Sequence, residues 1–384
     1  MSFYLRSNRY ARKKDARLKP KLPTQNKEVI VFPFQSNNLF FVNQHAVGNK
    51  LHYLSWACCL LFSTVQATAQ DAHYTQFGYA QFQISPSLTG VFQGDQRYTV
   101  NLRRQWWNVP VAYQQMSGAF DKRFRRKNGE ASPWAAGLVV SHDIAGDSKL
   151  YSAEANLLGS YTQILSKRQF LSAGVLAGAG HRGFDSNDLH FDDQYDGETN
   201  SLPTQEPFER FSNNHLNFSA GLNWRWKGDS TRTVFDAGVG FLRLNTPQNG
   251  FWSDPDFKSP RRFTGYLLGT WQLTRRFDMV THVVFQQQGP HREWLISAYG
   301  RTHISQQKTR ELALQYGVGY RGKDAVYPQL IVQYQTWHVG LSYDVNLSKF
   351  RTASRSNGGP EISIIYIFRK VPYLSYCPTC PKYM

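Results

Sequence analysis

Residues 336–347 read TWHVGLSYDVNL, and apolar side chains alternate with small or polar ones along the whole segment. One face carries Trp337, Val339, Leu341, Tyr343, Val345 and Leu347, and the other carries His338, Gly340, Ser342, Asp344 and Asn346. Successive side chains of a β-strand point to opposite faces, so the segment is predicted to be a strand with one apolar face.

The same period of two recurs elsewhere, for example in LNFSAGLNWRW (216–226) and ELALQYGVGY (311–320). Strands of globular proteins usually have about five or six residues, whereas a tilted transmembrane strand needs about 9 to 11. These segments have the greater length. Tryptophans gather near their ends, as in the aromatic girdles of membrane barrels: Trp106, Trp107, Trp224, Trp226, Trp271 and Trp337. The sequence therefore predicts an all-β fold, an antiparallel transmembrane β-barrel of the outer membrane.

Fourteen candidate strands can be counted, an even number as in single-chain bacterial barrels. They are 97–107, 111–124, 133–143, 150–164, 168–183, 214–226, 231–243, 261–274, 277–287, 292–304, 309–321, 325–333, 336–347 and 360–370. The long connections, 184–213, 244–260 and 348–359, all follow odd-numbered strands and so share one side of the membrane. Long loops are typically extracellular and short turns periplasmic.

Composition agrees with this class. A mean hydropathy of −0.50 excludes a bundle of membrane helices. The 21 Tyr and 10 Trp suit a protein with two membrane–water interfaces. The net charge of +17 is concentrated toward the start, where residues 1–49 hold nine Lys and Arg against Asp15 and Glu28. Removal of the first 69 residues with a signal peptide would take away nearly half of the excess charge. We therefore expect no nucleic-acid partner.

Residues 50–69 have the layout of a secretory signal peptide: a basic start, the apolar run LSWACCLLFSTV (54–65) and the end ATAQ. The run is shorter than the roughly 20 residues of a membrane-spanning helix. Cleavage is expected between Ala69 and Gln70. Residues 1–49 are then either a basic cytoplasmic extension or the product of a start codon placed too far upstream, and the second is favoured.

The exported chain is expected to begin with a periplasmic lead-in, 70–96, followed by the barrel, 97–370. Ser85 precedes a proline, which disfavours helix at that point, and Gly90 permits a turn into the first strand. The aromatic residues of the lead-in are expected on the rim or inside the lower lumen, unless the segment is disordered.

An ordered set of motifs resembles the PorP/SprF family, outer-membrane proteins of the Bacteroidota type IX secretion and gliding motility apparatus. The residues of the lead-in motif are Gln76, Phe77, Pro86, Gly90, Arg103, Gln105 and Trp106, while Ser85 and Ser87 stand where the family has Asn and Ala. The stretch 137–165 is similar to a family hairpin, and 343–368 to the closing one. The resemblance implies a non-enzymatic role in protein transport, supporting export or surface anchoring of a secreted adhesin or effector together with other secretion-system proteins.

Two other functions stay open. One is a general porin or small-solute channel on the same fold, and the other is a soluble β-rich binding protein. A porin conducts steadily, whereas an assembly component has a filled lumen. Small residues on the lumen face leave room for a peptide or loop: Gly174, Gly178, Gly238, Gly240, Gly317 and Gly319.

Candidate chemistry is sparse. His338 and Ser342 share the polar face of one strand, which is the lumen face, so they are not expected to form a lipase site, and we expect neither a cofactor nor an enzyme. An acidic loop offers weak calcium candidates, Asp192, Asp193 and Asp196. The tail 371–384 holds Cys377 and Cys380 in a C-x-x-C, a possible disulfide in an exported protein.

A basic cluster, residues 122–127, falls at the second turn and faces the periplasm on the expected topology. It is either a contact for peptidoglycan or an acidic protein, or simply a soluble turn.

Overall fold

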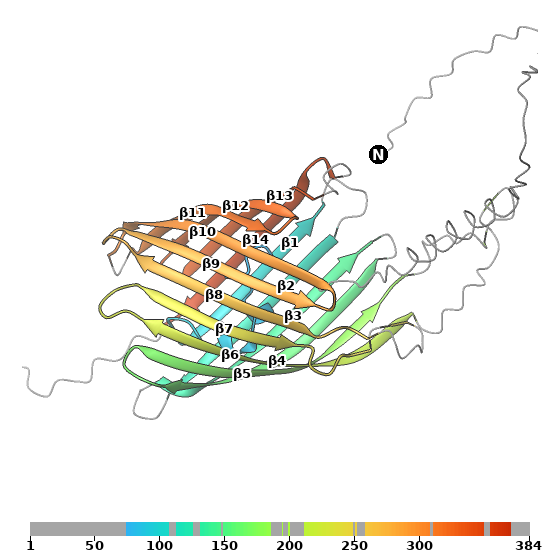
Figure 1. The fold of residues 1–384 in the computed structure, drawn as a ribbon, viewed down its shortest axis with the longest axis horizontal. Helices are drawn as coiled ribbons and strands as arrows, with labels where there is room; N and C mark the ends of the chain where they lie inside the picture. The colour runs from blue at the N-terminus through green and yellow to red at the C-terminus, as the bar shows by residue number, and fades with distance from the viewer. Residues whose placement is uncertain are drawn as a thin grey trace, which may run out of the picture. The chain divides into compact units, whose positions relative to one another are not determined.

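The computed structural model describes residues 74–106, 113–125, 131–146, 149–185, 194, 199, 211–248, 250–251, 258–307, 310–348 and 354–369. Within them, fourteen antiparallel strands form a closed barrel (Figure 1). Each strand pairs with its neighbours in sequence, and β1 closes the ring by pairing with β14. No helix in these ranges is long and apolar enough to cross a bilayer.

The strands are β1 Gln96–Gln105, β2 Tyr113–Arg125, β3 Ala131–Ala145, β4 Leu150–Ile164, β5 Gln169–Gly183, β6 Ser212–Lys227, β7 Val234–Leu242, β8 Arg262–Gln272, β9 Phe277–Gln288, β10 His291–Ser305, β11 Leu312–Arg321, β12 Ala325–Tyr334, β13 Trp337–Asn346 and β14 Asn357–Phe368. All fourteen predicted strands are confirmed, with ends within three residues of those expected. The late start of β7 has a local cause, because the amide of Gly228 donates to the carbonyl of Thr233 and so closes the preceding turn.

The strands present their apolar face to the outside of the barrel, as the alternation predicts. In β13, Leu341 is 52% exposed, whereas its neighbour Ser342 is 2% exposed and Asp344 1%. No water is present in a bilayer to satisfy unpaired backbone groups, and closure of the ring pairs β1 with β14 so that no sheet edge is left open. The outer surface is therefore built for lipid.

Aromatic side chains on the outer face form two girdles, one at each end of the barrel. At the end with the short turns, neighbouring strands bring together Trp337, Tyr366, Tyr98 and Phe120, then Trp134 and Tyr161, and then Trp224, Phe235 and Trp271. At the end with the long loops they bring together Phe241, Phe263, Phe285 and Trp294. Amphipathic rings prefer the two membrane–water interfaces, so the girdles mark the depth of insertion.

Leu341 lies near the middle of β13. Leu341→Arg is expected to lower the free energy of unfolding by about 2–4 kcal/mol, the cost of an arginine on the lipid face at the bilayer midplane. Leu347 lies on the same face just past the end of β13, so Leu347→Arg is the matched control, with an expected cost of about 0–1 kcal/mol near the interface. Denaturant unfolding in phospholipid vesicles measures both, and equal costs would mean that Leu341 does not lie deeper in the bilayer than Leu347.

Candidate functional site

The lumen of the barrel is occupied by residues 74–95, which precede β1 and are called the plug below. Figure 1 draws this segment in blue, inside the ring of strands. Its two 3-10 helices, η1 Gln81–Gln83 and η2 Pro86–Leu88, lie among lumen-facing side chains. Tyr74, Phe77 and Phe82 are 3%, 4% and 7% exposed. The aromatic residues of the lead-in thus pack inside the barrel and not on its rim.

The local sequence explains the path of the plug. Ser85 is extended, as the residue before a proline should be, and its side chain caps η2 by accepting from the amide of Ser87. Pro86 takes the first helical position, where no amide donor is needed. Gly90 has a φ of 72°, which only glycine adopts without strain, and an added Cβ there would collide with Ala135. The chain can then turn toward β1.

A buried ionic hub holds the first residues of the plug. The hub consists of Arg103, Arg321, Asp344 and Glu361, whose side chains are at most 2% exposed. Asp344 accepts from both guanidinium groups, each at 2.7 Å. The carboxylate of Glu361 accepts the amides of Thr75 and Gln76, also at 2.7 Å each. Bonds to a charged acceptor are stronger than neutral ones, so the hub fixes this part of the plug firmly.

A second buried cluster holds the other end of the plug. Arg97 and Asp121 form a two-point ion pair, with Nε to Oδ1 at 2.8 Å and Nη2 to Oδ2 at 2.9 Å. Asp121 also accepts the amide of Gly90 at 2.7 Å, and Arg123 donates to the carbonyl oxygens of Gly90 and Phe92. The Arg97 guanidinium stacks on the ring of Phe92, 4.7 Å from its centroid. This cluster, called the base cluster below, orients the plug where it joins β1.

Between the two clusters the plug packs in three apolar groups. The largest joins Phe77, Ile84, Leu88 and Val91 to Tyr266, Leu268, Val284, Leu295 and Tyr327 of the wall. Phe82 packs on Leu158 and Leu176, and Phe92 on Ile365 and Ile367. Three wall glycines, Gly174, Gly221 and Gly240, lie against residues 84–87 so closely that a Cβ at any of them would collide with the plug. The wall is therefore shaped around this segment.

The plug runs along most of the lumen. Its start is bound by Asp344 and Glu361, in the parts of β13 and β14 that adjoin the long connection between them. Its end lies by the short turns, where the amide of Asp95 donates to the carbonyl of Phe368 at 2.9 Å.

The lead-in motif is brought together only in part. Gln76, Phe77, Pro86 and Gly90 lie in the plug, and Arg103 belongs to the ionic hub that binds Gln76. The two other motif residues are apart from the lumen site. Gln105 ends β1, and Trp106 follows it with a φ of 56°, its ring against that of Tyr113 at 4.9 Å.

Several predicted sites lie outside the described residues: the cleavage position Ala69–Gln70, the calcium candidates Asp192, Asp193 and Asp196, and the pair Cys377 and Cys380. Within the described part of the chain, no three His, Cys, Asp or Glu side chains are grouped so that they could hold a metal ion. Of the six lumen glycines, Gly174 and Gly240 face the plug, whereas the other four make room for the neighbouring wall.

The basic cluster at the second turn separates into different roles. Arg123 points into the lumen and binds the plug, and Arg125 pairs with Asp95 at 2.5 Å. Lys122 lies over the ring of Phe124 on the outer face, 6.0 Å from its centroid. Two of these three cations are therefore engaged by the plug segment itself, and residues 126 and 127 lie outside the described ranges.

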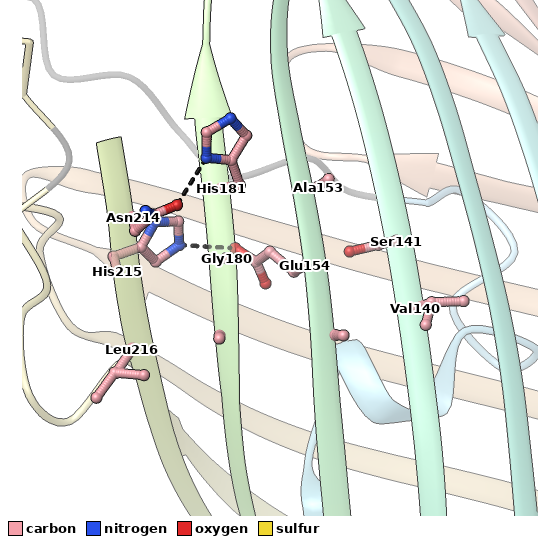
Figure 2. Close-up of a pocket in the computed structure, with 11 residues that line it drawn as sticks. Val140, Ser141, Ala153, Glu154, Gly180, His181, Asn214, His215 and Leu216 are labelled. Carbon is pink, nitrogen blue, oxygen red and sulfur yellow. Dashed lines mark hydrogen bonds and ion pairs between the residues drawn. The ribbon is translucent and has the colours of Figure 1, made fainter. Parts of the chain in front are cut away.

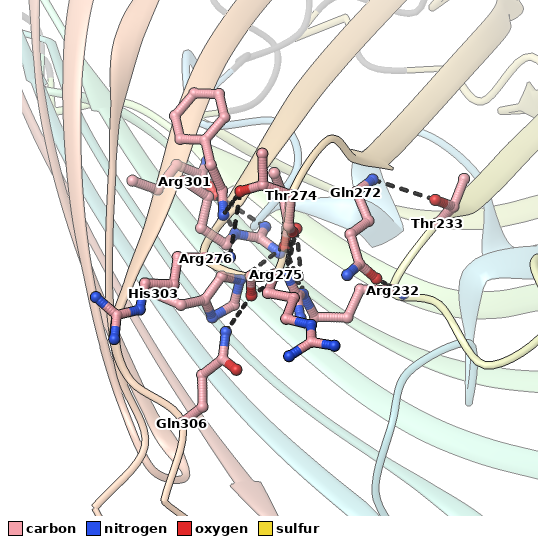
Figure 3. A network of polar contacts seen from close by, with 12 residues as sticks. Arg232, Thr233, Gln272, Thr274, Arg275, Arg276, Arg301, His303 and Gln306 are labelled. Atoms are coloured by element: carbon pink, nitrogen blue, oxygen red, sulfur yellow. Dashed lines mark hydrogen bonds and ion pairs between the residues drawn. The ribbon is translucent and has the colours of Figure 1, made fainter.

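A polar network at the short-turn end ties several hairpins together (Figure 3). The carboxylate of Asp278, which is fully buried, accepts from Arg232 Nη2 at 2.7 Å and pairs with His303 Nε2 at 2.7 Å. Arg232 also donates to the carbonyl of Arg275 at 3.0 Å. Each group has a structural partner, so the network fixes the turns and holds no free nucleophile or base.

A hollow of about 570 Å³ lies across β3 to β6 (Figure 2). Its lining includes the small side chains of Ala153, Ala155 and Ala179, and His181 and Asn214, which are joined by a contact of 2.7 Å between Nδ1 and Oδ1. The hollow shares its strand face with exposed, lipid-facing Leu216 and Val140, and it contains no catalytic arrangement.

Sequence patterns had not identified Asp121, Arg321 and Glu361 as functional. The available signal was a charged residue at a lumen-facing position inside an otherwise apolar or small strand. Such a charge is costly unless paired, so each one indicated a partner of opposite charge on the lumen side. What the sequence alone could not supply was the identity of that partner.

The fold and lumen define a class of protein: an outer-membrane β-barrel whose interior holds the segment that precedes its first strand. The family model for the type IX secretion system membrane protein PorP/SprF matches residues 66–366. The chain belongs to this family, which confirms the resemblance seen in the motifs and the location in the outer membrane. Membership also implies other components of the secretion system as partners.

Solved structures with a similar fold share little sequence. The toluene transporter TbuX of Ralstonia pickettii is 12% identical, with 76% of this chain and 94% of that chain covered and a TM-score of 0.44. A FadL homologue of Pseudomonas aeruginosa is 11% identical, with 74% and 93% covered and a TM-score of 0.41. No curated protein matches the chain significantly. Similarity at this level gives no information about what this protein binds or transports.

Gly174→Val is expected to displace the plug, because any side chain at this position collides with the backbone of Pro86. Gly159→Val on the adjacent strand is the matched control, since the nearest atom to an added Cβ there is 4.0 Å away. Limited proteolysis of the purified barrels should cut residues 74–95 in the first variant and spare them in the second. Equal protection in both would contradict the assigned position of the plug.

Asp121→Ala is expected to lower the free energy of unfolding by about 3–5 kcal/mol, because it leaves the Arg97 charge buried without its carboxylate. Arg168 and Asp229 form an ion pair at the short-turn rim, with side chains 50% and 60% exposed. Asp229→Ala should therefore cost less than about 1 kcal/mol. Denaturant unfolding of both variants in vesicles compares the two costs; a small cost for Asp121→Ala would show that the base cluster is dispensable.

Proposed function

We propose that this protein is a non-enzymatic barrel of the type IX secretion system that supports export or surface anchoring of a particular secreted adhesin or effector. The observation that carries the proposal is the occupied lumen. A general porin needs a continuous aqueous path, and here the plug fills the lumen with buried ion pairs and three apolar groups. The alternative of a small-solute channel is disfavoured on that ground.

A non-enzymatic role is supported by the structural use of the residues that could have formed a lipase site. Hydrolytic chemistry needs a nucleophile and base within hydrogen-bond reach, with donors for the developing charge. His338 and Ser342 share the lumen face, but Ser342 accepts from the Gln76 side chain of the plug at 3.1 Å. That serine therefore serves to hold the plug.

The partner surface is proposed to lie on the long loops 184–213 and 244–260, whose described ends are joined. The ring of Phe184 packs on Phe211, with centroids 5.6 Å apart, and on Phe251, 4.8 Å apart. The guanidinium of Arg182 lies over the ring of Phe251 at 5.8 Å. The described parts of the two loops are thus packed together, which supports a single composite surface.

Deletion of the gene is expected to abolish surface display of one or a few secreted proteins, with uptake of small solutes unchanged. The measurements are the surface proteome of intact cells and the rate of solute entry. Replacing residues 184–213 with a short Gly-Ser loop should spare barrel folding and impair that display.

The porin alternative predicts the opposite pair of results. A deletion strain with normal surface proteins and slowed solute entry would overturn the secretion proposal. Steady conductance of the purified barrel in a planar bilayer would do the same, because a plugged lumen should not conduct.

A further inference from the structure

The wall of the lumen binds many backbone groups of the plug. Wall side chains bind the amides of residues 75, 76 and 90 and the carbonyl oxygens of residues 79, 83, 88, 89, 90, 91 and 92. Ser160 Oγ, for example, donates to the carbonyl of Thr89 at 2.8 Å, and Arg262 Nη2 to that of Gln83 at 2.8 Å. Contacts of this kind are independent of side-chain identity.

Several of these binding groups are also held in place by other wall residues. Asp121 fixes Arg97, and Asp236 fixes Arg225 through Nε to Oδ1 at 2.8 Å and Nη2 to Oδ2 at 2.9 Å. In the hub, Asp344 fixes Arg321. Groups that are already held in position cost little to bind with, which favours the binding of a peptide at this site.

Side-chain contacts add selectivity: the hydroxyl of Thr75 donates to Asp344 at 2.8 Å, and the side-chain amide of Gln76 donates to Ser342 at 3.1 Å. The glycine floor formed by Gly174, Gly221 and Gly240 admits only a small side chain at position 85. Ser87 is fully buried, with its hydroxyl 3.2 Å from that of Tyr266, so position 87 also requires a small side chain. The apolar groups of the wall accept large side chains at positions 77, 84 and 88.

Within the described residues, the plug is covalently joined to the barrel at one end only. Asp95 leads directly into β1, and the preceding Gln93 is exposed at the short-turn rim. The segment from Tyr74 to Phe92 contacts the wall without being part of the sheet. It is bound as a ligand is bound.

From these observations we propose that the lumen wall is a peptide-binding site whose ligand in cis is the plug, and that a separate peptide can replace it. The ligand class is a peptide that can adopt the 3-10 turns of the plug, with small residues at the Ser85 and Ser87 positions and apolar ones at the Phe77, Ile84 and Leu88 positions. The binding itself is independent of the proposed function. Only the natural source of a second peptide, a segment of the secreted partner, rests on that function.

The test uses the full barrel with a protease site inserted between Gln93 and Gly94. After the folded protein is cut in detergent or vesicles, a dye-labelled synthetic peptide of residues 74–93 is added. Fluorescence anisotropy should show saturable binding of one peptide per barrel, with competition by the unlabelled peptide. Uncut protein is the control and should take up no label.

Changes in the peptide keep the test independent of barrel folding. A peptide with Ser85→Phe should bind at least about tenfold more weakly, because the phenyl ring meets the glycine floor; tenfold corresponds to roughly 1.4 kcal/mol. A peptide with Gln93→Ala should bind as the unchanged one, since Gln93 is exposed. A scrambled peptide should not bind.

Two results would overturn the proposal. In one, the cut plug departs and no peptide rebinds. In the other, the cut plug stays for days and no label enters, which would make it a permanent part of the core. Neither result concerns surface display in cells, so failure here is distinguishable from failure of the secretion role.

Discussion

A ring of fourteen strands encloses more space than its own lumen-facing side chains can fill. A barrel of about eight strands is just wide enough for side chains to meet across the interior. In a wider ring the space must hold water or further chain. Here residues 74–95 occupy this space, and the arrangement of the wall follows from their presence. The glycine floor, the lumen-facing Leu268, Val284 and Leu295, and the two buried ionic clusters have a physical reason only because a peptide lies against them.

Charge fixes where the peptide lies, while apolar packing supplies most of the attraction. Burying apolar area is favourable but non-directional, so the three apolar groups alone would permit sliding. A buried ion pair is weak evidence for stability, yet it penalises any arrangement that leaves a charge without its partner. Glu361 accepts hydrogen bonds from two backbone amides of the plug, and Asp121 accepts one from a third. We infer that these two carboxylates set the register of the plug along the lumen.

The sequence predicted the wall far better than the contents of the lumen. A period of two is a property of a single strand, so all fourteen strands and their lipid-facing sides could be found, and Leu341 and Asp344 were placed on the correct faces. Strand ends were less accurate where turns take their own hydrogen bonds, as at Gly228 and Thr233.

The lumen contacts join residues far apart in the chain, which no local pattern encodes. Thr75 and Glu361 are an example, and Ser87 with Tyr266 is another, their hydroxyls 3.2 Å apart. The sequence did contain the conditions for such contacts: small residues on the lumen face, an aromatic lead-in and a glycine able to turn. It gave no pairing between them, because side-chain partners across a barrel depend on closure and register.

The ionic hub and the base cluster hold the two ends of the plug, and they differ in how easily they can release it. Release of Thr75 and Gln76 from Glu361 leaves Asp344 still paired with both arginines of the hub, so the wall keeps its charges matched. The base cluster is harder to break, because Asp121 binds the amide of Gly90 and the guanidinium of Arg97 together, beside the covalent link to β1. Local opening proceeds from the least stable region, and the plug should therefore loosen first at the end near the long loops. A peptide from a partner held on those loops would meet the vacated hub before any other part of the site, while the barrel retains its own plug as a tethered competitor.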